Sequence, residues 1–183
     1  MKLFTMRPTL HTDRLTLRPL DDSDLEDLVA MNGDPEVMAH IGAPMPPDEV
    51  ATELARWTIE DSEFGLWTGH ADGAFAGVWF LTRDPDDPGA GEIGWRLPRH
   101  AWGQGYAVEG GRAMVEHAFT TLGLERVWAE TMAVNARSRR VMDRLGMTHV
   151  RTEVRTWDDP IPGWEQGEVV YELTSSRPGP SQP

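Results

Sequence analysis

In some segments of the chain apolar and polar residues alternate as in a strand, and in others apolar residues recur every three to four positions as in a helix. Short segments rich in β-formers, bounded by turn residues, predict strands at 14–18, 65–70, 75–82, 91–97, 127–132, 148–156 and 168–174. Apolar residues at helical spacing predict helices after Asp21 or Asp22, from Pro46 to about Trp57, across 108–122 and across 135–145. A short helical turn is expected at 36–39, after the break at 32–35.

The order of these elements indicates the fold class. It is strand, helices, three strands, helix, strand, helix and two strands, with no internal repeat. Such an order predicts an α/β (α+β) domain in which helices pack on a mixed sheet. A length of 183 residues favours one domain with a substantial core.

Composition and charge exclude several classes of function. Asp and Glu number 30 against 17 Lys and Arg, so the formal net charge is 17 − 30 = −13. Nucleic-acid binding needs clustered cations and is not expected, whereas an acidic surface suits solubility or a cationic partner. No segment is apolar enough for a membrane helix, and the start lacks a signal peptide, so a cytoplasmic protein without a membrane partner is expected.

Cysteine is absent, which excludes disulfides, thiolate metal sites and a cysteine nucleophile. The six histidines show no zinc-type spacing, so no metal is expected. No Gly-x-Ser-x-Gly elbow is present, so a hydrolase triad is not expected either.

A glycine-bearing loop between a strand and a helix is the strongest candidate for a binding site. It reads Trp102-Gly103-Gln104-Gly105-Tyr106-Ala107. Glycines let backbone amides approach a ligand, and the free amides at a helix start favour a phosphate or pyrophosphate. The loop matches neither a P-loop nor a dinucleotide fingerprint, and a purely structural turn is the alternative.

Two longer segments carry a resemblance to a known family. The segment GEIGWRLPRHAWGQGYAVEGGRAMVEHAF, followed by WAETMAVNARSRRVMDRLGM, resembles the GNAT N-acetyltransferase superfamily, in particular its RimJ/RimL-like branch. The opening TDRLTLRPLDDSDLEDL is similar to the start of that branch. The resemblance covers 12–174, and leaves residues 1–11 as an N-terminal extension and residues 175–183 as a disordered tail.

The resemblance implies a single-domain, mostly antiparallel twisted sheet with helices on both faces. Acetyl-CoA would lie between two splayed parallel strands, 91–97 and 127–132. Main-chain groups of Arg96 and Leu97 would meet the pantetheine arm, the amides of 103–107 would hold the pyrophosphate, and Asn135 would lie near the thiol. The expected cofactor-binding residues are Arg96, Leu97, Trp102, Gly103, Gln104, Gly105, Tyr106, Ala107, Asn135, Ser138 and Arg140.

Transfer of an acetyl group to an amine needs a base, and the leaving thiolate needs stabilisation or a proton. Many members of the superfamily use a tyrosine as the acid, but Met142 stands at the matching position. Ser138 is the preferred acid, with a capping or packing role as its alternative. Glu92 is the preferred base, with an ion pair to Arg96 on the same strand face as its alternative; Glu109 and Glu130 are weaker base candidates.

The function expected from this resemblance is acetyl-CoA-dependent N-acetyl transfer to a primary amine in a ternary complex. The acceptor would be a protein N-terminus or a small amine, including a cationic one, and a homodimer is common in this branch. A GNAT-like module that binds acyl-CoA without turnover, and an unrelated phosphate-binding protein, are the alternatives. Trp57, Trp67 and Trp164 either frame the acceptor cleft or pack in the core.

Overall fold

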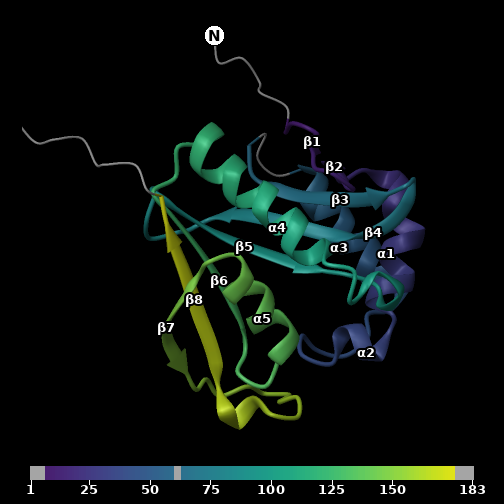
Figure 1. Ribbon diagram of the computed structural model, residues 1–183. Helices are drawn as coiled ribbons and strands as arrows, with labels where there is room; N and C mark the ends of the chain where they lie inside the picture. Colours follow the sequence, from purple (N-terminus) through teal and green to yellow (C-terminus); the bar gives the residue numbers. More distant parts are fainter. Residues whose placement is uncertain (1–6, 60–62, 176–183) are drawn as a thin grey trace, which may run out of the picture.

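The computed structural model describes residues 7–59 and 63–175 (Figure 1). Residues 176–183, which make up nearly all of the predicted tail, and residues 1–6 of the predicted N-terminal extension lie outside the described residues. The strands are β1 (Leu10–His11), β2 (Thr16–Pro19), β3 (Gly65–Ala71), β4 (Ala74–Arg83), β5 (Ala90–Arg96), β6 (Arg126–Met132), β7 (Thr148–Glu153) and β8 (Glu168–Thr174). The α-helices are α1 (Leu25–Asn32), α2 (Pro35–Met38), α3 (Pro47–Ile59), α4 (Tyr106–Glu116) and α5 (Ala136–Arg144).

The strands form one sheet in the order β1-β2-β3-β4-β5-β6-β8-β7. Neighbouring strands are antiparallel except β5 and β6, which are parallel. Figure 1 shows α4 and α5 in front of the sheet, with α1 and α3 behind it. The prediction of a mixed, mostly antiparallel sheet with one parallel pair and helices on both faces is confirmed.

Each face of the sheet has its own apolar core. Under α4 and α5 the fully buried side chains include Trp67, Trp79 and Ile93. On the opposite face, α1 and α3 pack against side chains that include Leu66 and Val78. Alternation along each strand produces this division, because successive side chains point to opposite faces.

The parallel pair separates part of the way along its length. Register between β5 and β6 runs from Ala90↔Arg126 to Glu92↔Trp128 and then stops. Beyond this point β5 stays paired with β4 as far as Arg96, and β6 stays paired with β8 as far as Met132. Since both strands remain hydrogen-bonded on their outer sides, a wedge opens between their carboxyl ends without loss of the sheet on either side.

The structure differs from the sequence prediction mainly at element ends. Leu10–His11 form β1 and pair with β2, inside the segment assigned to an N-terminal extension. Strand β7 ends at Glu153 rather than residue 156. The α-helical part of α4 ends at Glu116 and a π-helical segment, His117–Thr121, completes the predicted helix. Asp21 caps a 3-10 turn that precedes α1.

Within the described ranges, the longest apolar helix falls short of what a membrane crossing requires.

Candidate active site

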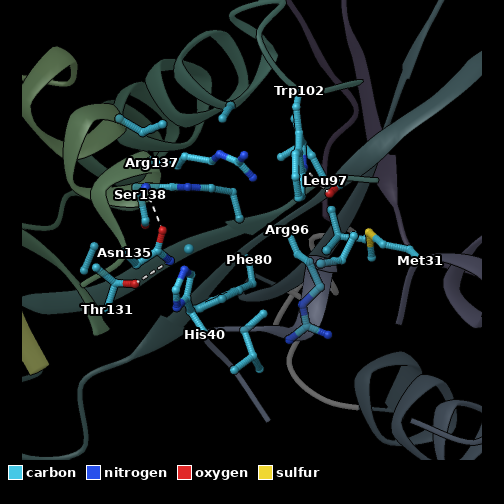
Figure 2. Close-up of a pocket in the computed structure, with 18 of the residues that line it drawn as sticks. Met31, His40, Phe80, Arg96, Leu97, Trp102, Thr131, Asn135, Arg137 and Ser138 are labelled. Atoms are coloured by element: carbon cyan, nitrogen blue, oxygen red, sulfur yellow. Dashed lines mark hydrogen bonds between the residues drawn. The ribbon is translucent and has the colours of Figure 1, made fainter. Parts of the chain in front are cut away.

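A cavity of about 1390 Å³ occupies the wedge between β5 and β6. Side chains of α1 and α3 line one end of it, and the glycine loop and the start of α5 line the other (Figure 2). Of the predicted cofactor-binding residues and the preferred acid and base, only Gln104 does not line the cavity. Those that do are Glu92, Arg96, Leu97, Trp102, Gly103, Gly105, Tyr106, Ala107, Asn135, Ser138 and Arg140.

The glycine loop presents backbone amides at one end of the cavity. Gly103 and Gly105 have φ angles of 74° and 86°, and Gly105 is the N-cap of α4. Glycine takes this left-handed conformation without the penalty that a Cβ imposes. The first backbone hydrogen bond into the helix is donated by Glu109 to the Gly105 carbonyl, at 3.1 Å. The amides of residues 106–108 therefore remain available for an anion.

Side-chain contacts hold the loop in place from outside the cavity. The Gln104 amide donates to the His100 carbonyl at 2.7 Å, and Arg14 donates to the Gln104 carbonyl at 3.0 Å. Glu109 forms an ion pair with Arg14 and accepts from the Thr12 hydroxyl at 2.6 Å. Gln104 and Glu109 thus fix the loop through Arg14. Because the Glu109 carboxylate is held by Arg14 and Thr12, it does not line the cavity.

Asn135 shapes the opposite wall as the N-cap of α5. Its side-chain oxygen accepts from the Ser138 backbone amide at 3.2 Å, and its amide donates to the Thr131 hydroxyl at 3.0 Å (Figure 2). The first of these contacts is the side-chain hydrogen bond by which Asn135 caps α5. The Ser138 hydroxyl lines the cavity and has no hydrogen-bond partner within residues 7–59 and 63–175.

A row of arginines on α5 adds positive charge to this otherwise acidic protein. Arg137, Arg140 and Arg144 are spaced for one helix face and line the cavity. The guanidinium carbon of Arg137 lies 4.2 Å from the ring centroid of Trp102. Arg144 was not among the predicted binding residues, although its helical spacing from Arg140 could have indicated it.

Glu92 is the ionisable group whose pKa is most perturbed toward neutrality. The pKa of Glu92 is raised from 4.5 to about 7, mainly by burial and also by the nearby Glu130 and Asp84, while Arg155 opposes the shift. Glu130 is bound by both terminal nitrogens of Arg155, each at 2.7 Å, so it is less suited to act as a base. A carboxyl that titrates near neutral pH meets the requirement for a general base.

Arg96 does not form the ion pair proposed as the alternative role of Glu92. Its guanidinium donates to the side-chain oxygen of Asn32 at 2.7 Å, and no carboxylate of the described chain lies within ion-pair distance of it. Burial lowers the pKa of Arg96. Glu92 and Arg96 share a strand face, but a separation of four residues keeps their Cα atoms about 13 Å apart.

The structure leaves few candidates for the acid. Met142, at the position where many relatives carry tyrosine, is buried against the cavity wall and has no proton to donate. Tyr106 lines the cavity, but the Arg14 guanidinium lies over its ring at 4.7 Å. Tyr171 is buried behind α5 and does not line the cavity. Ser138 and Thr131 carry the other hydroxyl groups of the cavity lining, and the Thr131 hydroxyl accepts a hydrogen bond from the Asn135 amide.

The three tryptophans singled out from the sequence separate into different roles. Trp57 lines the cavity and packs against Phe80, with ring centroids 6.2 Å apart. Trp67 is fully buried in the core under α4, and its indole donates to the Pro8 carbonyl at 2.9 Å. Trp164 does not line the cavity. A cleft role for Trp67 is therefore wrong and its core-packing alternative holds, while the role of Trp164 stays a prediction.

No group of three or more His, Asp or Glu side chains in the described ranges is arranged to hold a metal ion.

A splayed parallel strand pair, free amides at a helix start and a carboxyl of near-neutral pKa together define an acetyltransferase-type site. Residues 14–148 match the family model of the acetyltransferase (GNAT) domain. The chain belongs to the GNAT family of N-acetyltransferases and is an acetyltransferase.

Relatives and solved structures agree with this assignment. The chain is 42% identical over 181 residues to the FsC-acetyl coenzyme A-N(2)-transacetylase of Aspergillus fumigatus, covering 92% of this chain and 77% of that protein. A RimL ribosomal L7/L12 alpha-N-protein acetyltransferase in complex with coenzyme A has a TM-score of 0.78 at 17% identity, covering 91% and 98% of the two chains. Spermidine N-acetyltransferase from Vibrio cholerae, with CoA and spermine, also has a TM-score of 0.78, at 18% identity and 90% and 98% coverage. RimL among the neighbours supports the RimJ/RimL resemblance in fold.

Proposed function

We propose that this protein transfers the acetyl group of acetyl-CoA directly to the primary amine of an acceptor bound in the same cavity. The observation that carries the proposal is the wedge that opens after Glu92 and Trp128. At one end it presents amides to a diphosphate, and at the other it holds a carboxyl able to accept a proton near neutral pH.

The residues around the glycine loop fit coenzyme A. The amides of residues 103–107 suit the diphosphate. Backbone donors carry no formal charge, so even a protein that is acidic overall can bind an anion through them. Arg137, Arg140 and Arg144 add cations beside them for the remaining phosphate. Arg96 and Leu97 would meet the pantetheine arm through their main chain. Acetyl-CoA supplies the activated acetyl group when bound.

The proton transfers follow from the positions of two side chains. An amine is protonated in neutral water and must lose a proton before it can attack, so Glu92 would accept that proton directly or through a water molecule. The Ser138 hydroxyl would donate a hydrogen bond to the leaving thiolate and stabilise it, and the thiolate would take its proton from solvent. An acetylated cysteine is impossible because the chain contains no cysteine, which supports direct transfer.

The acceptor class is a primary amine. The name of the fungal relative specifies transfer to an N(2) position, and the two structural neighbours are named for a protein N-terminus and for spermidine. We favour a small-molecule amine, because the fungal relative is the most similar of these in sequence. The homodimer and the cytoplasmic location expected from the sequence stay predictions.

A second candidate is a module that binds acetyl-CoA without turnover, and the observation that favours it is Met142 in place of tyrosine. Isothermal titration with acetyl-CoA, together with a thiol-release assay over an amine panel, tests both. The proposal predicts binding and amine-dependent release of CoA. Since the protein has no thiol of its own, a thiol reagent reports CoA alone. Binding without release would favour the module, and no binding would overturn both.

A further inference from the structure

A cluster of hydrogen-bond donors lies at the end of the cavity that faces α1 and α3. It consists of the Arg96 guanidinium and the side-chain amide of Asn32, which is 7% exposed. Figure 2 shows Arg96 extending into the cavity, with Phe80 and Met31 on either side of it. Among residues 7–59 and 63–175, only one contact uses these donors, the 2.7 Å hydrogen bond from Arg96 to the Asn32 side-chain oxygen.

The charge of Arg96 is left without a direct partner in the described part of the chain. Arg18, Arg126 and Arg155 each pair with carboxylates at 2.6–3.0 Å, whereas Arg96 is influenced only at longer range, by Glu53. The amide nitrogen of Asn32 has no acceptor among the described residues either. A sheltered guanidinium is costly unless it is paired, so an acceptor for it is expected from a ligand.

We propose that Arg96 and Asn32 bind a carboxylate of the acceptor, so that the acetylated amine belongs to an amino acid or a short peptide. This inference rests on the proposed acetyl transfer and names its substrate class. A carboxylate only accepts hydrogen bonds, and its two oxygens match the parallel donors of a guanidinium. A polyamine, which offers cations alone, would place a positive charge against Arg96.

The same strand face explains how amine and carboxylate would be placed together. Glu92, Gly94 and Arg96 occupy every second position of β5 and so share one face of the strand. The Phe80 ring fills the space where a Gly94 side chain would be, with a ring atom 2.2 Å from an ideal Cβ. Phe80 with Trp57 forms an apolar floor between the carboxyl of Glu92 and the guanidinium of Arg96. The amine would lie toward Glu92 and the carboxylate toward Arg96, with the acceptor's carbon chain on the aromatic rings.

Matched pairs of amines test the assignment. Ornithine against putrescine, and lysine against cadaverine, differ only by a carboxylate, and glycyl peptides extend the series. The wild-type protein is expected to show a kcat/KM at least 10-fold higher for the carboxylate-bearing member. Arg96→Gln is expected to reduce this ratio below 3-fold, through a higher KM for the carboxylate-bearing member of each pair.

Two further variants separate recognition from folding. Asn32→Asp keeps Arg96 but gives it a neighbouring carboxylate, and is expected to lower the ratio as Arg96→Gln does. Arg112→Gln removes an exposed cation of α4 that does not line the cavity and donates to the Arg144 carbonyl, and it should leave the ratio unchanged. Thermal unfolding of each variant checks that the fold persists.

The outcomes distinguish this inference from the proposed function. Equal use of both members of each pair by the wild-type protein, or an unchanged ratio in both Arg96→Gln and Asn32→Asp, would overturn the inference alone. Acetyl-CoA binding without thiol release for any amine would reject the proposed function and the inference together.

Discussion

The Arg137 guanidinium lies 4.2 Å from the centre of the Trp102 ring and joins the start of α5 to the glycine loop across the cavity. The Trp102 indole also donates a 2.8 Å hydrogen bond to the Leu97 carbonyl just after β5. One side chain therefore fixes three parts of the candidate coenzyme site relative to one another. Stacking of this kind contributes about 0.5–2 kcal/mol.

Trp102→Ala is expected to weaken acetyl-CoA binding by about 5- to 30-fold, which corresponds to about 1–2 kcal/mol. The loss follows because the loop, the end of β5 and Arg137 are no longer held together. Trp102→Phe keeps a ring for Arg137 but has no donor for the Leu97 carbonyl, so its affinity for acetyl-CoA should lie between those of the wild type and Trp102→Ala. Isothermal titration measures both, and Trp157→Ala, an exposed tryptophan outside the cavity, is the control. Unchanged affinity in Trp102→Ala would refute the bridging role.

Gly105→Ala is expected to lower both stability and acetyl-CoA affinity. An alanine at φ 86° costs about 1–2 kcal/mol, and relief of that strain would turn the loop amides away from the diphosphate. Gly123→Ala introduces the same strain at φ 70°, in open space and away from the cavity. Urea unfolding should therefore show similar losses for both variants, while titration should show at least a 5-fold loss of affinity for Gly105→Ala only.

Glu92→Gln is expected to lower kcat/KM by about 100-fold at pH 8, because the amide cannot accept a proton. In the wild-type protein the rate should rise with pH as Glu92 ionises around pH 7. That rise should be absent from the variant. A pH profile of identical shape in the two proteins would remove Glu92 from the mechanism.

The same substitution is expected to stabilise the fold at high pH. Below pH 4.5 Glu92 is protonated in both the folded and the unfolded protein, so its ionisation does not change the free energy of unfolding. Between pH 4.5 and about 7 the folded state keeps a proton that the unfolded state has lost, and stability falls as pH rises. At pH 8 Glu92→Gln should therefore gain up to about 3 kcal/mol relative to wild type. Urea unfolding at pH 4 and pH 8 measures the difference, and an equal effect at both pH values would contradict it.

Ser138→Ala is expected to lower kcat by about 10- to 100-fold with an unchanged affinity for acetyl-CoA. The hydroxyl has no other partner in the described chain, and Asn135 caps α5 through the Ser138 backbone, so the substitution leaves the helix start intact. Ser138→Thr keeps a hydroxyl and should recover part of the rate. A wild-type kcat in Ser138→Ala would assign the serine to packing alone.

Local sequence determined most of the secondary structure and the glycine-loop part of the candidate site. Alternation and helical spacing predicted the seven longer strands and the helices that flank the glycine loop, because these patterns depend only on which face of an element is buried. The positive φ angles of Gly103 and Gly105 could likewise be anticipated, since glycine is the residue that adopts them at little cost. Strand β1, with only two residues, has no pattern of its own and forms by pairing with β2.

Tertiary structure decided the relationships between elements that are distant in the chain. Glu92 and Arg96 are four residues apart, and spacing allowed an ion pair. Only the packing of α1 showed that Arg96 meets Asn32, 64 positions away, and only the pairing of β5 with β6 showed that Glu92 lies near Glu130. The pKa of a carboxyl and the partner of a guanidinium depend on what folding brings near them and on how much water it removes. The sequence thus supplied the chemical groups and their local conformations, and the three-dimensional arrangement set their charge states and partners.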